Sequence, residues 1–244
     1  MYSLVTTKDG SNTLYSKEYK QHYHNIDDGA VFETLSKHVI PAFTFHKQKD
    51  QVNILDICFG LGYNTLGTIY YIKNNNINSK INIYSPELDK KLIKSLENFI
   101  YPKEFDILVP IIKQLCKNLY YKDEQIEIRL YIGDAKNYLK NLDIKFDIIY
   151  QDAFSSDVNY ELWTKEYFQL LYNLSKEDTI ITTYSIATPV RLSMYEAGFK
   201  IYEYIPLKRK QTLAFISYQN ILGKYVDMKL KKINNPKAKA LYDR

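Results

Sequence analysis

The sequence predicts an α/β protein in which a mostly parallel sheet is covered by helices on both faces. From residue 51 onward, short apolar runs alternate with helical patterns, as in parallel strands joined by helical crossovers. The run at residues 146–151 is almost continuously apolar, which is typical of a strand buried on both faces. A glycine-containing turn at residues 58–62 follows the first of these strands, as in Rossmann-like domains.

The composition fits one large domain with a small attachment. The chain has 244 residues, of which 45% are hydrophobic and 25% charged, enough for a sizeable core. Its net charge of +5 is compatible with a nucleic-acid substrate but is shared by many enzymes. Two cysteines, Cys58 and Cys116, argue against a disulfide framework. Without a signal-peptide core or an apolar run near the ~20 residues that span a membrane, we expect a cytoplasmic protein with no membrane contact.

Residues 1–28 are expected to form a hairpin extension. Residues 4–7 and 13–16 are extended stretches around Asp9-Gly10, and Asp-Gly favours a hairpin turn. From residue 29 to about Lys47, apolar side chains recur at three- and four-residue intervals, which predicts a helix that Pro41 kinks or ends. We assign residues 29–222 to the Rossmann-like domain and residues 223–244 to a basic, loosely attached tail.

The large domain is expected to contain a seven-stranded sheet. Its strands are expected at residues 52–56, 80–85, 125–131, 146–151, 179–184, 199–205 and 211–218. Helices are expected at residues 64–72, 89–98, 161–173 and 189–197, with a partly helical insert at 101–121. The last two strands suit an antiparallel pair that closes the sheet.

The strand-to-helix turn at residues 54–64 is the strongest local motif. Its glycines, Gly60 and Gly62, remove side chains where a ligand must approach the backbone. Such turns bind phosphate, and the carboxylate of S-adenosylmethionine could meet the same backbone N–H groups. A tight turn without a ligand is the structural alternative. The candidate cofactor-binding residues of this motif are Asp56, Phe59, Gly60, Gly62 and Asn64.

Acids follow the next two strands. Glu87 ends the second strand, where a carboxylate can accept hydrogen bonds from ribose hydroxyls, and Asp89 is its rival. Asp134 and Ala135 follow the third strand, where an acid suits the adenine amino group. Acids at such positions are also common helix N-caps, so both interpretations of Asp134 stay open.

The fourth strand ends in Asp152, close to Phe154. A carboxylate there can hold an amine that is to be methylated, and the aromatic ring can stack on a base or pack against the methyl group. The alternative is an acid that caps the following turn. Trp163 is expected in the core. His22 and His24 lack a nearby cysteine that would complete a metal site, so we expect no metal.

Four blocks of the sequence match a known family. They lie at residues 9–16 with 23–24 and 29–33, at 59–64, at 152–155 with 159 and 161–164, and at 183–187 with 190–191 and 197–199. On these blocks the chain resembles the MnmC-type tRNA methyltransferases, which complete 5-methylaminomethyl groups on the wobble uridine. Arg209-Lys210 stands where the family often has a basic pair. Cys58 replaces a usual glycine, and Ser156 and Tyr160 replace usual prolines.

The resemblance implies a class I S-adenosylmethionine-dependent methyltransferase fold, S-adenosylmethionine as cofactor and tRNA as partner. The implied acceptor is the primary amine of 5-aminomethyl(-2-thio)uridine. Asp152 would orient this amine and take or relay its proton. Phe154 and Tyr184 would pack the base. Glu33 would reach the cofactor, and Asp152 is also a candidate cofactor contact. Candidate phosphate contacts are Lys208, Arg209, Lys210, Lys229, Lys231 and Lys232.

Bifunctional members of the family carry a flavin-dependent oxidase domain. This chain has no room for one, so it resembles the stand-alone form, with a separate oxidase acting upstream. Two alternatives stay open. The first is an aminopropyltransferase of polyamine synthesis, against which the first and fourth blocks argue. The second is a non-catalytic RNA-binding protein on the same fold, against which the complete set of glycines and acids argues.

Overall fold

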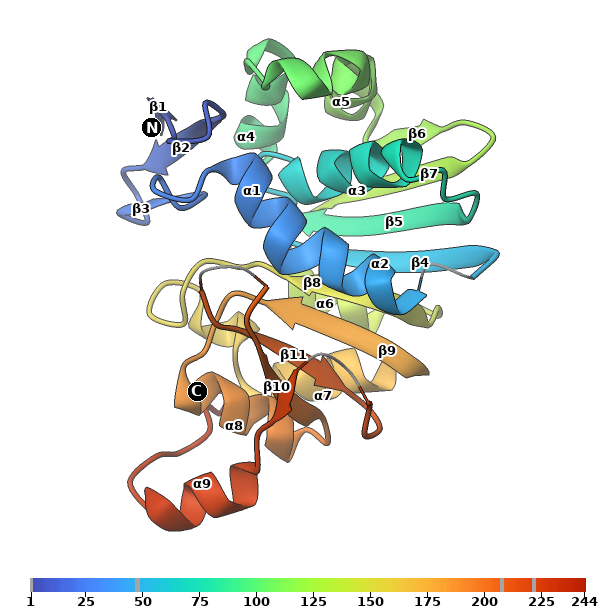
Figure 1. The fold of residues 1–244 in the computed structure, drawn as a ribbon. Coiled ribbons are helices and arrows are strands. Elements are labelled where there is room, and N and C mark those ends of the chain that lie inside the picture. The colour runs from blue at the N-terminus through green and yellow to red at the C-terminus, as the bar shows by residue number, and fades with distance from the viewer. Residues whose placement is uncertain (1, 47–48, 207–208, 221–222) are drawn as a thin grey trace.

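The computed structural model describes residues 2–46, 49–206, 209–220 and 223–244. Their strands form a small three-stranded sheet at the N-terminus and a nine-stranded central sheet. Figure 1 shows the small sheet beside one end of the central sheet, with helices on both faces of the latter. The predicted α/β architecture is confirmed.

The N-terminal sheet contains the predicted hairpin. Strands β1 (Tyr2–Thr6) and β2 (Asn12–Ser16) pair antiparallel, with Thr6 opposite Asn12 across the Asp-Gly turn. The structure adds a third strand, β3 (Gln21–His22), that pairs with β2. A strand of two residues leaves no alternating pattern in a sequence, so it was not predicted.

Asp9 connects this sheet to the first helix. Its carboxylate accepts hydrogen bonds from the backbone N–H groups of Ser11 and Phe32, both at 3.0 Å. Gly29 lies against the same carboxylate, and a Cβ at this position would stand 1.9 Å from Asp9 Cγ. The residues that begin the helix therefore also hold the hairpin in place.

The predicted helix at residues 29–47 is interrupted. It consists of α1 (Ala30–Thr34), a π-helical segment η1 (Leu35–Val39) and α2 (Ile40–His46). Pro41 has no N–H, so it cannot bond the carbonyl of Lys37 four residues earlier. Gln211 Nε2 donates to that carbonyl instead, at 3.1 Å. The helix is thus disrupted in the segment just before Pro41. The predicted end of the helix, Lys47, lies outside the described residues.

The central sheet has the order β12-β10-β11-β9-β8-β4-β5-β7-β6. Its strands are β4 (Gln51–Ile57), β5 (Lys80–Glu87), β6 (Tyr120–Lys122), β7 (Ile126–Ile132), β8 (Phe146–Gln151), β9 (Ser175–Thr183), β10 (Lys200–Tyr204), β11 (Gln211–Phe215) and β12 (Lys224–Tyr225). The pairs that join β7, β5, β4, β8 and β9 are parallel, and β11 runs antiparallel to both its neighbours.

The seven predicted strands are present, but the predicted strand number is wrong by two. Short strands β6 and β12 extend the two edges of the sheet and are only three and two residues long. Runs of this length carry no recognisable period, and their pairing depends on neighbours already in the sheet. The helix α6 between β7 and β8 was also missed, because its six residues are too few to show a helical period.

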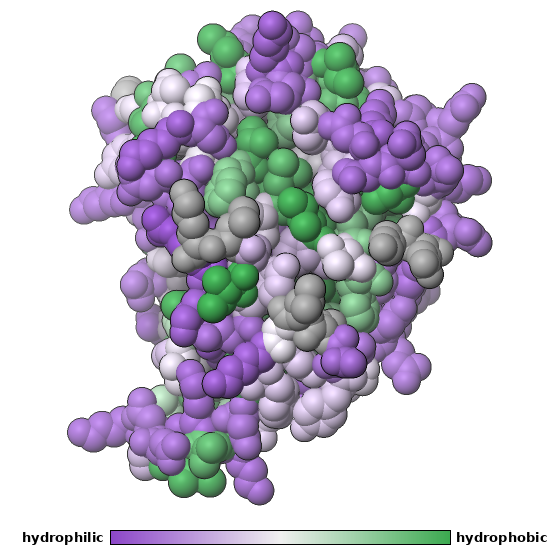
Figure 2. Space-filling view, in the orientation of Figure 1, coloured by the Kyte–Doolittle hydropathy of each residue, from purple (hydrophilic) through white to green (hydrophobic). Residues whose placement is uncertain are grey.

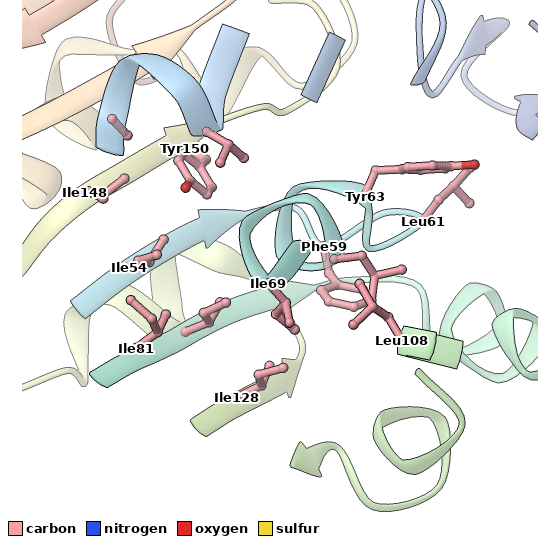
Figure 3. Close-up of a cluster of buried hydrophobic side chains, with 14 of the residues drawn as sticks. Ile54, Phe59, Leu61, Tyr63, Ile69, Ile81, Leu108, Ile128, Ile148 and Tyr150 are labelled. Carbon is pink, nitrogen blue, oxygen red and sulfur yellow. The ribbon is translucent and has the colours of Figure 1, made fainter. Parts of the chain in front are cut away.

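The core consists of two clusters, one between the helices and each face of the central sheet. The remaining helices are α3 (Tyr63–Asn74), α4 (Lys90–Ser95), η2 (Leu96–Asn98), η3 (Lys103–Leu108), α5 (Val109–Asn118), α6 (Ala135–Lys140), η4 (Tyr160–Leu162), α7 (Lys165–Asn173), α8 (Thr188–Glu196) and α9 (Met228–Asn234). Successive strand residues face opposite sides, so Ile54 joins one cluster and Leu55 the other. Figure 3 shows the first cluster, in which Ile69 of α3 packs over Ile81 and its neighbours.

The C-terminal segment packs more tightly than expected. Met228 of α9 is fully buried, and the carbonyl of Leu241 accepts a hydrogen bond from Lys165 N at 2.7 Å. Thr164 Oγ1 donates to Asp243 at 2.7 Å. The expectation of a loosely attached tail is therefore wrong, because a few apolar residues anchor a segment whose charge dominates its composition.

Hydrophilic side chains cover most of the face that Figure 2 shows, and hydrophobic ones gather near its centre.

Most helices in the described residues are short, and the longest of them, α3, has 12 residues. None of the helices in the described part of the chain has the length and apolar character needed to cross a membrane.

Candidate active site

A cleft of about 920 Å³ opens where the parallel strands end. The chain moves from β4 to β5 on one side and returns to β8 on the other, and ligands of such sheets bind at this reversal. Residues 19–27 of the N-terminal segment supply one wall. The volume lies in the usual range for small-molecule sites.

The turn between β4 and α3 depends on left-handed backbone conformations. Gly60 and Gly62 have φ angles of +55° and +76°, and a Cβ on Gly62 would lie 2.8 Å from Phe59 Cζ. Cys58 adopts a φ of +65° despite its side chain, at the position where a glycine is usual in the resembled family. Cys58 and Gly60 line the cleft.

Four residues predicted to contact the cofactor do not line the cleft, namely Asp56, Phe59, Gly62 and Asn64. The carboxylate of Asp56 is fully buried and accepts hydrogen bonds from Thr65 Oγ1 at 3.0 Å and Asn64 Nδ2 at 3.3 Å. Burial raises the pKa of Asp56 to about 7. Phe59 packs in the core. These residues shape the turn from behind the cleft, and their contact with a cofactor stays a prediction.

Glu87 lies where the ribose-binding acid was predicted. It is 9% exposed and lines the cleft, with Oε2 accepting from Gly60 N and Oε1 from Asp89 N, both at 2.9 Å. Burial raises the pKa of Glu87, although these backbone hydrogen bonds oppose the change. The rival Asp89 caps α4 through Lys91 N at 2.7 Å and bonds the hydroxyl of Tyr2. Glu87 is therefore the buried and oriented carboxylate of the pair.

Asp134 caps a helix, as one of its two interpretations expected, and it also lines the cleft. Its Oδ1 accepts from Asn137 N at 2.8 Å and so caps α6, while Asp134 and Ala135 both line the cleft. The preceding Gly133 donates its N–H to the Glu87 carbonyl at 2.9 Å. This bond ties the end of β7 to the end of β5, so the two acids share one wall.

Asp152 lies on the opposite side of the cleft. Its Oδ2 accepts a hydrogen bond from Asn64 Nδ2 at 2.9 Å, and its Oδ1 lies 3.4 Å from Nε2 of the buried His38. Burial alone would raise the pKa of Asp152. The charge of the nearby His38, with smaller effects of His24 and Asn64, lowers the pKa below its ordinary value. The carboxylate is thus kept ionised.

Aromatic side chains surround Phe154. Its ring centroid lies 4.9 Å from that of Tyr23 and 5.1 Å from that of Tyr19, and all three residues line the cleft. Tyr184 also lines it and donates to the Ala153 carbonyl at 3.0 Å. Trp163 is fully buried, which confirms its predicted place in the core.

Several of these residues were missed by sequence reasoning. Tyr19 and His38 lie far along the chain from Phe154 and Asp152, and no spacing in the sequence connects them. Tyr23 belongs to the first block of the family resemblance, which was the one available signal. Gln21 Nε2 donates to Ser155 Oγ at 2.7 Å and holds the N-terminal wall against the loop after β8.

Glu33 reaches the cleft as the resemblance implied. Its carboxylate accepts from Asn25 N at 2.7 Å and pairs with Lys37. His24 Nδ1 lies 3.1 Å from Thr13 Oγ1, so this histidine has a structural partner. Within the described ranges, no group of three or more His, Cys, Asp or Glu side chains could hold a metal ion.

The predicted basic residues fall in two places. Arg209 and Lys210 line the cleft. Arg209 pairs with Asp28 at 3.0 Å, and Lys210 pairs with Glu203 at 2.9 Å. Lys208 lies outside the described residues. Lys229, Lys231 and Lys232 belong to α9 and do not line the cleft, and Figure 1 shows α9 far from the N-terminal sheet.

The cleft fits S-adenosylmethionine by its chemistry. Glu87 presents a buried carboxylate with both oxygens fixed by backbone N–H groups, as ribose hydroxyls require. A Cβ on Gly60 would lie 3.3 Å from Tyr23 Cδ1, so the glycine keeps this part of the cleft open. The carboxylates of Glu33 and Asp152 suit a ligand with positively charged sulfur and nitrogen.

Comparison with known proteins agrees with this chemistry. Residues 102–217 match the model of a family described as S-adenosyl-L-methionine-dependent methyltransferase. The crystal structure of MnmC2 from Aquifex aeolicus superposes with a TM-score of 0.86 and 29% identity, covering 100% of this chain and 79% of that chain. These comparisons show that the chain is similar to S-adenosyl-L-methionine-dependent methyltransferases in sequence and in fold. The predicted class I fold and the predicted cofactor are confirmed.

Two curated relatives extend the comparison. The chain is 29% identical over 222 residues to an uncharacterised protein of Methanocaldococcus jannaschii, covering 89% of this chain and 59% of the relative. It is 28% identical over 213 residues to the tRNA 5-methylaminomethyl-2-thiouridine biosynthesis bifunctional protein MnmC of Azoarcus, covering 82% of this chain and 33% of the relative. The predicted resemblance to MnmC proteins is confirmed, and the chain spans about a third to three fifths of the length of these relatives.

Proposed function

We propose that the protein methylates the primary amine of 5-aminomethyl(-2-thio)uridine at the wobble position of tRNA, in the cytoplasm, to give the 5-methylaminomethyl nucleoside. The names of the MnmC relatives support this class of substrate. One observation in the structure carries the proposal. The ionised carboxylate of Asp152 and the rings around Phe154 line the same cleft as Glu87. The carboxylate can bind an amine and the rings can stack on a base, next to the part of the cleft that fits the cofactor.

The bound cofactor supplies a methyl group on a sulfonium, which a nucleophile with a free electron pair can attack. An alkylammonium has no such pair, so the acceptor must first lose a proton. Asp152 binds and orients the ammonium, and its low pKa keeps the carboxylate charged for this contact. The ammonium gives its proton to water in the open cleft before the amine attacks. Fixing the amine against the methyl group lowers the barrier by saving orientational entropy.

The rest of the cleft suits a nucleotide on RNA. Flipped or single-stranded RNA bases stack on aromatic side chains, and Tyr19, Tyr23, Phe154 and Tyr184 provide them. Arg209 and Lys210 at the same cleft are candidates for phosphate contacts. We also propose that a separate flavin-dependent oxidase supplies the aminomethyl group.

The test is Asp152→Ala, measured by methyl incorporation into tRNA and by calorimetric binding of S-adenosylmethionine. We expect transfer to be abolished while cofactor affinity changes by no more than a few-fold, because Glu87 and the glycine turn are intact. Asp157→Ala is the matched control, since Asp157 is exposed on the same loop and does not line the cleft. Normal turnover in Asp152→Ala would remove Asp152 from the mechanism.

The acceptor is identified by mass spectrometry of wobble nucleosides from cells that lack the protein. Accumulated 5-aminomethyl- or 5-carboxymethylaminomethyluridine supports the proposal and shows the upstream route. An unchanged nucleoside profile contradicts it. A preference of the purified protein for decarboxylated S-adenosylmethionine would instead indicate aminopropyl transfer, and absence of binding to either compound would indicate a non-catalytic RNA-binding protein.

A further inference from the structure

His38 is a buried histidine directly behind the acceptor side of the cleft. It is fully inaccessible and belongs to the π-helical segment η1, and it does not itself line the cleft. Its Nδ1 lies 2.8 Å from Thr182 Oγ1, and its ring packs edge-on against Tyr150 at 5.6 Å. These contacts fix the plane of the imidazole.

The other ring nitrogen of His38 has no hydrogen-bond partner. Nε2 is buried and lies 3.4 Å from Asp152 Oδ1, close enough for an ion pair but not aligned as a hydrogen bond. An unpaired buried polar atom costs free energy, so its presence needs a reason. In other proteins, π-helical segments such as η1 often occur at functional sites.

We propose that His38 is a positioning residue that keeps the Asp152 carboxylate ionised and fixes its Oδ1 at the cleft. The assignment of a catalytic consequence rests on the function proposed above. Asn64 restrains Oδ2 from one side, and His38 restrains Oδ1 from the other. The carboxylate is therefore held by two side chains that do not touch the substrate. The direction of the pKa shift of Asp152 agrees, because His38 is its main opposing influence against burial.

Other titratable groups face this pair from every surrounding element. They are His24 of the N-terminal segment, Glu33 of α1, Asp56 of β4, Tyr150 of β8, and Tyr184 after β9. The two carboxylates oppose ionisation of Asp152 and His24 supports it. His38 is the group whose nitrogen lies nearest to the Asp152 carboxylate among these, so its removal isolates the effect.

The decisive experiment needs no RNA. The carboxyl resonance of Asp152, assigned by its loss in Asp152→Asn, is titrated by NMR in the wild-type protein and in His38→Leu. We expect the midpoint to rise by about one pH unit in His38→Leu, a tenfold change in proton affinity. His38→Gln, which retains an N–H near the Nε2 position, should recover much of the wild-type midpoint. An unchanged midpoint in folded His38→Leu overturns the proposal.

His46→Leu is the matched control. His46 is also buried with an unpartnered Nε2, but it lies near Lys49 and Asp147 rather than Asp152. It should leave the Asp152 midpoint unchanged, and an equal rise in His46→Leu would show a general loss of packing and overturn the assignment. Should His38→Leu not fold, Thr182→Val removes the Nδ1 partner instead, and we expect a smaller rise in the same direction. No rise in Thr182→Val then overturns the proposal.

A second measurement separates this inference from the proposed function. With S-adenosylmethionine and aminomethylated tRNA, His38→Leu should lower kcat about 10- to 100-fold, move the acidic limb of the pH profile upward and leave cofactor affinity within about twofold. A wild-type protein that does not methylate this tRNA, together with the NMR shift, contradicts the proposed acceptor but supports the role of His38. A normal kcat and pH profile in His38→Leu overturns that role in catalysis.

Discussion

The cofactor side of the cleft is assembled from neighbours, whereas the acceptor side is assembled from distant segments. Gly60, in the turn after β4, and Glu87, at the end of the adjacent β5, are joined by a hydrogen bond and lie 27 residues apart. On the acceptor side, Gln21 meets Ser155 across 134 residues and His38 meets Thr182 across 144. The first side can thus form from one βαβ unit, but the second requires the completed sheet.

The two sides also treat buried acids differently. Asn64 Nδ2 contacts both Asp56 and Asp152, yet burial raises the pKa of Asp56 to about 7 while the pKa of Asp152 is lowered. The hydrogen-bond partners of Asp56 are neutral and the charge of Asp152 adds to the effect of burial, whereas His38 and His24 lower the pKa of Asp152. Environments that separate two similar acids in this way allow one to stay neutral and the other to carry charge.

Asp56→Asn tests this contrast with the largest expected effect. The folded protein holds the Asp56 proton up to about pH 7, whereas the unfolded chain loses it near 3.8, so stability falls as the pH rises through this window. The loss attributable to Asp56 is about 4 kcal/mol at 1.36 kcal/mol per pKa unit. Urea unfolding from pH 5 to 8 should therefore show a shallower decline in Asp56→Asn. Parallel stability curves for the two proteins would contradict the raised pKa.

Glu87→Ala should disable the cofactor side alone. It removes a carboxylate that can accept two hydroxyl hydrogen bonds and also releases Gly60 N and Asp89 N. At ~1.5–3 kcal/mol for a charged hydrogen bond, we expect calorimetry to show S-adenosylmethionine affinity weaker by a factor on the order of 100. Glu97→Ala, an exposed change just beyond α4, serves as the control. Unchanged affinity would place the ribose elsewhere.

Phe154→Ala should affect the acceptor side with the smallest effect of the three. Stacking of one base on an aromatic ring contributes ~1–3 kcal/mol, so KM for tRNA should rise about tenfold or more. Cofactor affinity should not change, because Phe154 lies on the opposite wall. Phe99→Ala, which removes an aromatic ring outside the cleft, controls for general destabilisation. An equal loss of cofactor and tRNA binding would show that the two sides are not separate.

Sequence reasoning succeeded where function follows from local order. Glu87, Asp134 and Asp152 were predicted because each follows a strand, and parallel strands end at one edge of a sheet. It did not foresee that Asp56 and Asn64 lie behind the cleft, since a pattern that places a residue at a strand end does not say which way its side chain points. His38 and Tyr19 escaped because their importance arises only from tertiary contacts.

The same limit applies to the fold. The long alternating strands were predicted, but strands β6 and β12 depend on pairing partners rather than on their own residues. The helix interruption was predicted near Pro41. The backbone carbonyl left without a helical partner there accepts a hydrogen bond from Gln211, which lies in a strand 170 positions after Pro41, so no local pattern could predict this contact.

The N-terminal wall has a consequence for biosynthesis. Residues 19–27 leave the ribosome early, but the groups they pack against, Phe154 and Ser155, are translated much later. During synthesis at about 5–20 residues per second, this segment waits several seconds for its partners. This side of the cleft is therefore completed only after residues 154 and 155 have been synthesised.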